Sequence, residues 1–291
     1  MTPDTDTRTA LVTGANSGLG KAIAHALASR GLRVGMVARD RIRGEAALDE
    51  LRAQTGNADL HLFLADLSDQ TQIRALAAQV LERFDRLHVL VNNAGTAFPE
   101  RRLSPDGIEC ALAVNHLAPF LLTQLLLERL KDSAPARIVN VGTRIDTAMD
   151  FSDLNWERRP YRLMRAYGQS KLGNLHFTFE LARRLSGSGV TVNCVFPGVF
   201  RSNLGGTDGA QGRFWKLVDR LIGWALHSPD AAARPLIELA LSPEWDAVSG
   251  AYLAKGRRLR PPAQTLDPNA NRQLWTRSEQ LTGLAAFHPG A

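Results

Sequence analysis

Short apolar runs alternate with segments of helical period along most of this chain. The runs end in glycine or polar residues and are rich in Val, Ile, Leu and Ala, which is typical of strands buried on both faces of a sheet. This alternation predicts an α/β fold with a parallel sheet and helices on both faces. The predicted strands cover 9–15, 32–40, 60–68, 87–95, 136–143, 189–198 and 249–255, and the predicted helices cover 21–30, 41–54, 70–83, 107–131 and 166–186.

The size of the chain fits one domain of this class. It has 291 residues, of which 44% are hydrophobic and 22% are charged, enough for one large core. We assign 1–7 to a flexible N-terminal tail and 8–291 to a single domain. Two segments interrupt the alternation after strand ends, 144–166 and 201–230. Ligands bind at such strand ends, so both segments are predicted to form a lid region over a substrate.

Composition gives little support to a membrane, secreted or nucleic-acid-binding protein. No apolar run reaches the roughly 18 residues that a membrane span needs, and the N-terminus MTPDTDTRTA carries two aspartates instead of a signal peptide. Cys110 and Cys194 lie in apolar runs, which favours two buried thiols over a disulfide, and two are too few for a zinc site. The net charge is +6, but the arginines are scattered, so no nucleic-acid partner is expected. A cytoplasmic location is expected, and no metal.

A glycine-rich loop follows the first predicted strand. The stretch TGANSGLGK places Gly14, Gly18 and Gly20 between a strand and a helix. Glycine lets the backbone turn sharply and approach a pyrophosphate, and the helix N-terminus offers free N–H groups. The flanking strand and helix make this a strong indication of a dinucleotide site, although an ordinary tight turn is the alternative.

A tyrosine and a lysine lie four residues apart in the stretch AYGQSK. Tyr167 and Lys171 would share one face of a helix, one turn apart. An ammonium near a phenol stabilises the phenolate and lowers the phenol pKa, which suits proton transfer near neutral pH. A helix surface pair without chemistry is the alternative, because the spacing alone is common.

Taken together, the motifs of this chain resemble the short-chain dehydrogenase/reductase family over nearly its whole length. TGANSGLG, NNAG at 92–95, Asn115 in a long predicted helix, YGQSK and PG at 197–198 occur in the family's order. The stretches NHLAPFLL at 115–122 and YGQSKLGNLHFT at 167–178 are closest to the retinol dehydrogenase and protochlorophyllide reductase branch. The resemblance implies a Rossmann-type, doubly wound parallel sheet of about seven strands. The N-terminal membrane anchor of microsomal members has no counterpart here, so no anchor is expected.

The resemblance also implies roles for four residues. Tyr167 would be the general acid/base, and Lys171 would lower its pKa and hydrogen-bond the nicotinamide ribose. Asn115 would hold a water that links Lys171 to solvent, although a capping or solvated asparagine is the alternative. Thr143 replaces the usual serine; its hydroxyl can still donate to a carbonyl oxygen, but its methyl takes space. We expect a working site with a changed rate or shape, unless Thr143 merely ends its strand. His116 is interpreted as a packed core histidine.

The end of the second strand decides the cofactor prediction. In our alignment, the position that is acidic in NAD-preferring members is Ala38, and the cation Arg39 follows it, which favours a 2′-phosphate and therefore NADP. An alignment shifted by two residues would place Asp40 there and favour NAD. By resemblance, the remaining cofactor-binding residues are Gly14, Asn16, Ser17, Gly18, Leu19, Gly20, Asp66, Leu67, Asn92, Asn93, Ala94, Gly95, Tyr167, Lys171, Pro197, Gly198 and Ser202.

The two interrupting segments carry the substrate prediction. Phe214, Trp215 and Trp224 in 201–230 favour an apolar pocket and a lipophilic or aromatic substrate, although a helix stripe packed on the core is the alternative. The segment 144–166 carries four arginines. Contact with an acidic substrate is one interpretation of them, and a solvated face is the other.

We therefore expect an NADP(H)-dependent carbonyl reductase that acts on a small-molecule carbonyl/alcohol pair. A redox-neutral enzyme on the same fold, such as an epimerase, dehydratase or cyclase, is one alternative, motivated by Thr143. A non-catalytic NADP-binding regulatory protein is the other. Family members often pair through their long helices, so a homodimer or homotetramer is expected as readily as a monomer.

Overall fold

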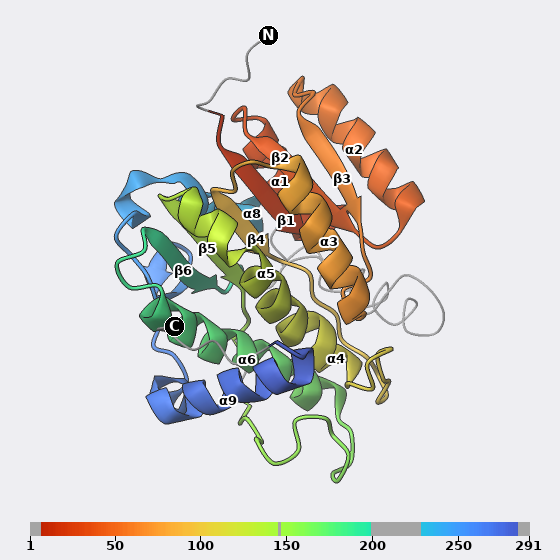
Figure 1. Cartoon of the computed structure of the whole chain (residues 1–291), viewed down its shortest axis with the longest axis vertical. Helices are drawn as coiled ribbons and strands as arrows, with labels where there is room; N and C mark the ends of the chain where they lie inside the picture. The colour runs from red at the N-terminus through yellow and green to blue at the C-terminus, as the bar shows by residue number, and fades with distance from the viewer. Residues whose placement is uncertain (1–6, 145–146, 199–227, 285–291) are drawn as a thin grey trace.

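The computed structural model describes residues 7–144, 147–198 and 228–284. One sheet of eight strands forms the centre, in the order β3-β2-β1-β4-β5-β6-β7-β8 (Figure 1). Strands β1 to β7 are parallel, as the sequence predicted. The strands are β1 Thr9–Thr13, β2 Arg33–Ala38, β3 Leu60–Leu64, β4 Val89–Asn92, β5 Ala136–Val141, β6 Val190–Val195, β7 Tyr252–Ala254 and β8 Arg257–Arg258.

The eighth strand was not expected. The predicted strand 249–255 is β7, and the chain then turns back at Lys255 and Gly256, both with positive φ, so that β8 pairs antiparallel with β7. β8 has only two residues, both exposed, and both are arginines. Charged residues on a short edge strand discourage pairing with another sheet.

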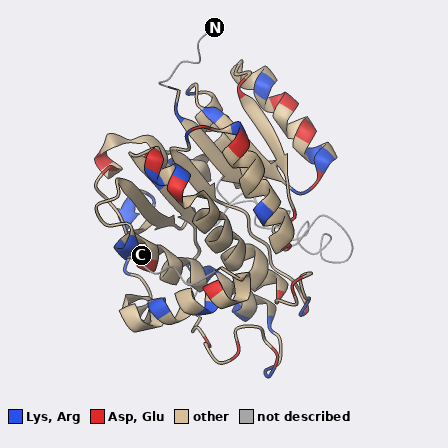
Figure 2. Ribbon diagram, in the orientation of Figure 1, with Lys and Arg blue, Asp and Glu red and all other residues tan. Residues whose placement is uncertain are grey.

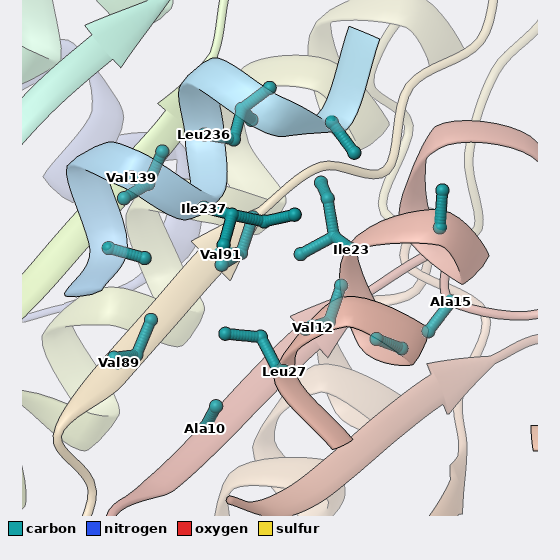
Figure 3. Packing of buried hydrophobic residues seen from close by; sticks show 14 of the residues in the cluster. Ala10, Val12, Ala15, Ile23, Leu27, Val89, Val91, Val139, Leu236 and Ile237 are labelled. Atoms are coloured by element: carbon teal, nitrogen blue, oxygen red, sulfur yellow. The ribbon is translucent and has the colours of Figure 1, made fainter. Parts of the chain in front are cut away.

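Helices cover both faces of the sheet. On one face lie α1, α2 and α8; on the other lie α3, α5 and α6. Successive side chains of a strand point to opposite faces of the sheet. In β1, Ala10 and Val12 therefore pack against the layer of α1, α2 and α8, which we call the first layer, and Leu11 between them packs against the layer of α3, α5 and α6. Figure 3 shows Ile23 and Leu27 meeting β1 and β4 in the first layer. The helices are α1 Gly18–Ala28, α2 Arg41–Thr55, α3 Gln70–Arg83, α4 Cys110–Leu112, α5 Ala118–Asp132, α6 Leu163–Arg184, α8 Pro229–Leu241 and α9 Pro268–Thr282, with short 3₁₀ turns at Pro243–Trp245 and Ala263–Leu266.

The long helix predicted over 107–131 is interrupted. A turn with Gly107 at φ 75° precedes α4, and a π-helical turn, Ala113–Leu117, joins α4 to α5. Together they span 23 residues, Cys110–Asp132, with a mean hydropathy of 1.6, which is long and apolar enough to cross a membrane. Its apolar residues are interrupted by Asn115, His116 and Gln124, so the helix passes by its mean hydropathy and not as the uninterrupted apolar run that the sequence analysis looked for. The apolarity serves the core, because 83% of the tested window is buried inside the fold.

Two helices near the C-terminus lay outside the predicted alternation. α8 completes the first layer through Leu236 and Ile237 (Figure 3). α9 runs along α6 (Figure 1), and its Trp275 ring lies 5.0 Å from the Phe120 ring of α5 and 6.0 Å from the Phe177 ring of α6. The long-helix face beneath α9 is thus covered by the chain itself.

Charge and thiol placement follow the sequence. Cys110 and Cys194 are free and buried, as predicted. Basic and acidic residues are interspersed on the outer helix α2 (Figure 2), so this helix does not present a face of one sign.

The order of the sheet reverses between β1 and β4, and ligands bind in such α/β folds at the carboxyl ends of the strands beside this reversal.

Candidate active site

The loop between β1 and α1 makes backbone contacts that require glycine. Gly14 has φ 65°, in the left-handed region, and a β-carbon on Gly20 would lie 2.2 Å from the Gly14 carbonyl oxygen. The helix α1 therefore starts tight against the loop, with its first N–H groups at the carboxyl edge of β1. Gly18 begins α1, and its neighbours are the half-buried Asn16, the exposed Ser17 and the buried Leu19.

The loop after β4 is tied to this glycine loop. The Thr13 hydroxyl oxygen accepts hydrogen bonds from the backbone N–H groups of Asn93 at 2.9 Å and Ala94 at 3.0 Å. The Asn93 side chain donates to the Thr13 carbonyl oxygen at 2.7 Å. These bonds bring Ala94 and Gly95 beside the glycine loop, as expected. The Asn93 side chain is used in holding the loop after β4 against the glycine loop.

Asn92 does not line this site, and the prediction that it contacts the nucleotide is wrong. Its side chain is 1% exposed and donates to Thr123 at 3.1 Å and to Asn140 at 2.9 Å. Asn140 in turn donates to Thr178 on α6 at 2.9 Å. Asn92 is the last residue of β4, and its side chain points to the α5 and α6 layer. It anchors β4 to β5 and α6.

The ends of β2 and β3 carry the residues expected near the adenine ribose. β2 ends at Ala38, so Arg39 is the first residue beyond the sheet, and it is exposed. Asp40 is the N-cap of α2 and accepts a hydrogen bond from the Arg43 backbone N–H at 2.9 Å. After β3, one Asp66 carboxylate oxygen accepts from the Ser68 backbone N–H and hydroxyl at 2.9 and 2.8 Å. The next residue, Leu67, is half-buried.

Tyr167 and Thr143 lie together, although they come from different elements. Thr143 follows β5 and Tyr167 is in the second turn of α6, and their side chains make a hydrogen bond. Burial raises the pKa of Tyr167 to about 12, and the bond from Thr143 opposes this shift. The sequence predicted a lowered pKa for Tyr167, but in this structure the pKa is raised, because desolvation outweighs the contact with Thr143.

Lys171 is buried one turn after Tyr167. It is 3% exposed, and its ammonium donates to the Val141 carbonyl oxygen at 3.0 Å. A β-carbon on Gly95 would lie 2.9 Å from Lys171 Nζ, so the glycine makes room for the ammonium beside the loop after β4. Burial lowers the pKa of Lys171 to about 8. The ammonium thus prevails below that pH.

Asn115 lies in the π-helical turn and is fully buried. Its amide exchanges two hydrogen bonds with the Thr96 backbone, both at 2.8 Å, and donates to the Ser170 hydroxyl at 2.9 Å. The Ser170 hydroxyl donates to the Tyr167 carbonyl oxygen at 2.8 Å. Both N–H groups of the amide are thus engaged, and Asn115 connects the loop after β4 to the helix that carries Tyr167. π-turns are frequent at functional sites.

The expected nicotinamide border is partly described. Pro197 and Gly198 follow β6, and Gly198 has φ 90°. Ser202 and the greater part of the predicted lid segment 201–230 lie outside the described residues. In 144–166, Leu163 begins α6, three residues before the predicted helix start.

Three residues that the sequence analysis left out support the site. Thr13 binds the loop after β4, Ser170 joins Asn115 to α6, and Tyr252 of β7 donates its hydroxyl to the Thr143 carbonyl oxygen at 3.0 Å. Position beside a motif could have suggested Thr13 and Ser170. Tyr252 is 109 residues from Thr143 in sequence, so only the sheet order reveals that contact. His116 is 1% exposed between Phe120 and Phe177, as predicted for a core histidine.

The site fits a nicotinamide dinucleotide. A cradle that a β-carbon would fill, at Gly20, lies at the N-terminus of α1, whose first turn has no acidic residue and no side-chain cap. Such an end receives a pyrophosphate. The glycine loop, the loop after β4 and the Thr143, Tyr167 and Lys171 side chains all lie at the carboxyl ends of β1, β4 and β5, which are adjacent in the sheet.

Comparisons with known proteins agree with this geometry. A family model described as short chain dehydrogenase matches residues 8–211. Retinol dehydrogenase 13 from Homo sapiens is 42% identical over 283 residues, which cover 96% of this chain and 86% of that protein. The similarity between this chain and retinol dehydrogenase 13 therefore extends over most of both sequences.

Solved structures agree as well. An uncharacterized protein from Mycobacterium paratuberculosis aligns with a TM-score of 0.76 and 33% identity, covering 95% of this chain and 93% of that chain. RhlG from Pseudomonas aeruginosa, solved as an active-site complex with NADP, aligns with a TM-score of 0.67 and 28% identity, covering 85% and 94%.

Proposed function

The chain belongs to the short-chain dehydrogenase family, in the retinol dehydrogenase branch, and on that premise we propose that it is an NADP(H)-dependent carbonyl reductase with Tyr167 as its acid. The single observation that carries the proposal is the contact between the Tyr167 and Thr143 side chains at the carboxyl end of the sheet. Two hydroxyl groups in contact can both donate to one carbonyl oxygen.

The protonation state of Tyr167 favours the reductive direction. With a pKa of about 12, the phenol keeps its proton at neutral pH, and this is the form that a general acid needs. A bound nicotinamide supplies the hydride in this direction and accepts it in the reverse one. Thr143 orients the carbonyl oxygen while Tyr167 gives it a proton. The tyrosinate that forms is then stabilised by the nearby buried Lys171 ammonium.

The positions of Lys171 and Asn115 support this scheme. Lys171 is anchored to the end of β5 through the Val141 carbonyl oxygen, and β5 leads directly to Thr143. Asn115 holds Thr96 and Ser170, so it fixes the position of α6 relative to the loop after β4. We propose that Asn115 acts mainly as a positioning residue. The water that the resemblance assigns to it would bind at its remaining carbonyl lone pair.

Two features support NADP over NAD. Asp40 is the N-cap of α2, and one of its carboxylate oxygens is already held by the Arg43 backbone N–H rather than directed to a ribose hydroxyl. Arg39 is exposed and is the first residue beyond the end of β2. A guanidinium there pairs with a 2′-phosphate. RhlG, which is 28% identical, was solved with NADP.

The substrate class and the setting are also part of the proposal. Retinol dehydrogenase 13 is 42% identical to this chain, which supports an alcohol/carbonyl pair on a largely apolar body. The two free buried thiols suit a reducing cytoplasm. α9 covers the aromatic patch on α5 and α6, so a homodimer or homotetramer would need another surface. Light scattering after size exclusion measures that state.

The test follows NADPH absorbance with a panel of aldehydes, ketones and quinones. Tyr167→Phe should abolish turnover and leave NADPH binding intact, because only the acidic hydroxyl is removed. Tyr161→Phe is the matched control: its hydroxyl bonds Phe98 and Glu109, away from Thr143, and most activity should remain. Turnover retained by Tyr167→Phe would refute the assignment. Product formed without NADPH consumption would instead indicate redox-neutral chemistry.

A further inference from the structure

The backbone just before Thr143 is held by two neighbouring elements. The Val141 carbonyl oxygen accepts a hydrogen bond from the Lys171 ammonium of α6 at 3.0 Å. The Gly142 backbone N–H donates to the Val195 carbonyl oxygen of β6 at 2.8 Å. These two bonds fix both polar atoms of the peptide group between Val141 and Gly142. The placement of Thr143 then depends on what holds the chain on its other side.

That other side is held by Tyr252. The Tyr252 hydroxyl donates to the Thr143 carbonyl oxygen at 3.0 Å, and no other described residue bonds this oxygen. Further along the chain, the next backbone hydrogen bond between described residues is at the Thr147 carbonyl oxygen, which accepts from Gln264 at 3.2 Å. In the part of the chain that the structure describes, the Tyr252 hydroxyl is therefore the one anchor of the backbone between Thr143 and Thr147.

Tyr252 is itself firmly placed. It begins β7, it is 5% exposed, and it pairs in register with Cys194 of β6. After the chain turns back, the Leu259 backbone N–H donates to the Tyr252 carbonyl oxygen at 2.8 Å. Burial raises the pKa of Tyr252 above its ordinary value, so the hydroxyl keeps its proton and remains a donor at neutral pH. A buried donor on a strand of the sheet can hold its acceptor in one position.

Gly142 allows the Tyr252 ring to approach the end of β5. A β-carbon on Gly142 would lie 2.5 Å from Cys194 Sγ and 3.9 Å from Cε2 of Tyr252. The first distance is too short for a side chain to fit without displacing the thiol. Glycine at this position thus lets β6 and β7 pack closely against the residues after β5, which brings the Tyr252 hydroxyl to Thr143.

The backbone of Thr143 decides where its hydroxyl points. A β-branched side chain has few χ1 rotamers, so the position of its Oγ1 follows the position of the backbone. The Thr143 and Tyr167 side chains bond each other in this structure, but a substrate carbonyl oxygen would receive both hydroxyl groups. The bond between them is then lost, and the hold on the Thr143 carbonyl oxygen remains. Misplacement of a reacting group by about 1 Å can cost about 10²-fold in rate.

We propose that Tyr252 is a positioning residue for the reduction, and that its hydroxyl sets where the Thr143 hydroxyl meets the substrate by holding the Thr143 carbonyl oxygen. The inference rests on the proposed reductase function and adds the last parallel strand of the sheet to the elements that determine its rate. Tyr252 contributes no atom to the reaction. Its effect falls on kcat, because the bond from Thr143 strengthens as negative charge develops on the substrate oxygen.

The test removes only the Tyr252 hydroxyl and follows NADPH oxidation with the best carbonyl substrate of the panel. Tyr252→Phe should lower kcat by about five- to twentyfold, which is less than the effect of removing the Thr143 hydroxyl itself. KM and the dissociation constant of NADPH should stay within about twofold, because the contacts made before the reaction are kept. Titration with NADPH should give as many sites as in the wild type, which excludes a loss of folded enzyme as the cause.

A double-mutant cycle with Thr143 separates positioning from a general structural effect. In a Thr143→Val background the hydroxyl to be aligned is absent, so Tyr252→Phe should change kcat by less than about twofold. Tyr161→Phe is the matched control, because it also removes a phenol hydroxyl that meets a polar group of the fold, the Glu109 carboxylate at 3.1 Å. Both tyrosine variants should lower the melting temperature comparably, but Tyr161→Phe should keep kcat close to the wild-type value.

The outcomes distinguish this proposal from the proposed function. Unchanged kcat in Tyr252→Phe would overturn the positioning role, and so would equal fold losses of kcat in the wild-type and Thr143→Val backgrounds. A comparable loss of kcat in Tyr161→Phe would also overturn it, because any lost phenol hydroxyl would then slow the enzyme. In each of these cases, wild-type turnover that depends on Tyr167 leaves the reductase function standing. Absence of NADPH oxidation by the wild type with the whole panel would overturn the function, and the positioning role with it.

Discussion

Two buried histidines make the docking of α9 sensitive to acid. His116, in the π-helical turn, lies 2.9 Å from the Ser278 hydroxyl through Nε2, and His176, on α6, lies 2.6 Å from the Asn271 amide oxygen through Nδ1. Both partners are on α9. Burial lowers the pKa of His116 from 6.5 to about 3 and that of His176 from 6.5 to about 4. Both histidines are therefore neutral in the folded protein at pH values where they are charged in the unfolded chain.

The magnitude follows from proton linkage. The unfolded chain binds more protons than the folded one below pH 6.5, so stability falls as the pH falls, until about pH 4 for His176 and about pH 3 for His116. From pH 6.5 to pH 5 each histidine costs about 2 kcal/mol, at about 1.4 kcal/mol per pH unit. The pair together costs about 4 kcal/mol, a large part of the roughly 5–15 kcal/mol that stabilises a typical domain.

Urea unfolding at pH 7 and pH 5, followed by circular dichroism, measures this loss. His116→Gln and His176→Asn keep a hydrogen-bonding amide near the same place but cannot be protonated in this range. The double variant should lose about 4 kcal/mol less than the wild type between the two pH values. His25→Gln, in α1 on the opposite layer, is the control and should change nothing. A double variant that loses as much stability as the wild type would refute the reasoning.

Three shorter predictions concern the site. Gly20→Ala should raise the dissociation constant of NADPH and lower the melting temperature, because its methyl meets the Gly14 carbonyl oxygen at 2.2 Å; Gly44→Ala, whose methyl would meet the flexible end of Leu62 at 2.9 Å and the Ala38 β-carbon at 3.3 Å but no backbone atom, is the control in the same assays. Thr143→Val should lower kcat by about 10²-fold and Thr143→Ser should not, because only valine removes the hydroxyl donor, and steady-state kinetics decide. Lys171 has a pKa of about 8, so kcat/KM for reduction should fall above that pH, and a flat profile from pH 6 to 10 would show that its charge is not needed.

The central sheet could be predicted because its strands are buried on both faces and therefore read as apolar runs. β8 could not, because two exposed arginines have no apolar signature, and only pairing with β7 makes them a strand. The helices α8 and α9 lie beyond the strand-helix alternation on which the prediction depended. The π-helical turn was also not foreseen, since five residues with one extra backbone step do not change the apolar pattern of a long helix.

The candidate site was also predicted only in part. Gly14, Gly20 and Lys171 were predicted at the cofactor or reacting end, and the structure brings them to adjacent strand ends. Asn92 was misplaced because side chains alternate between the faces of a strand, and the motif NNAG does not say which asparagine points to which face. The pKa of Tyr167 was misjudged because helix spacing reports a nearby charge but not the burial that opposes it.

The polar contacts around Tyr167 explain how one residue can be placed accurately without help from a ligand. Ser170 holds its backbone, Thr143 meets its hydroxyl, and Asn115 fixes the helix against the loop after β4. Each of these partners is itself bonded to another element, as Thr143 is through Tyr252. Such a network resists small displacements, because moving one member leaves a buried polar group unpaired.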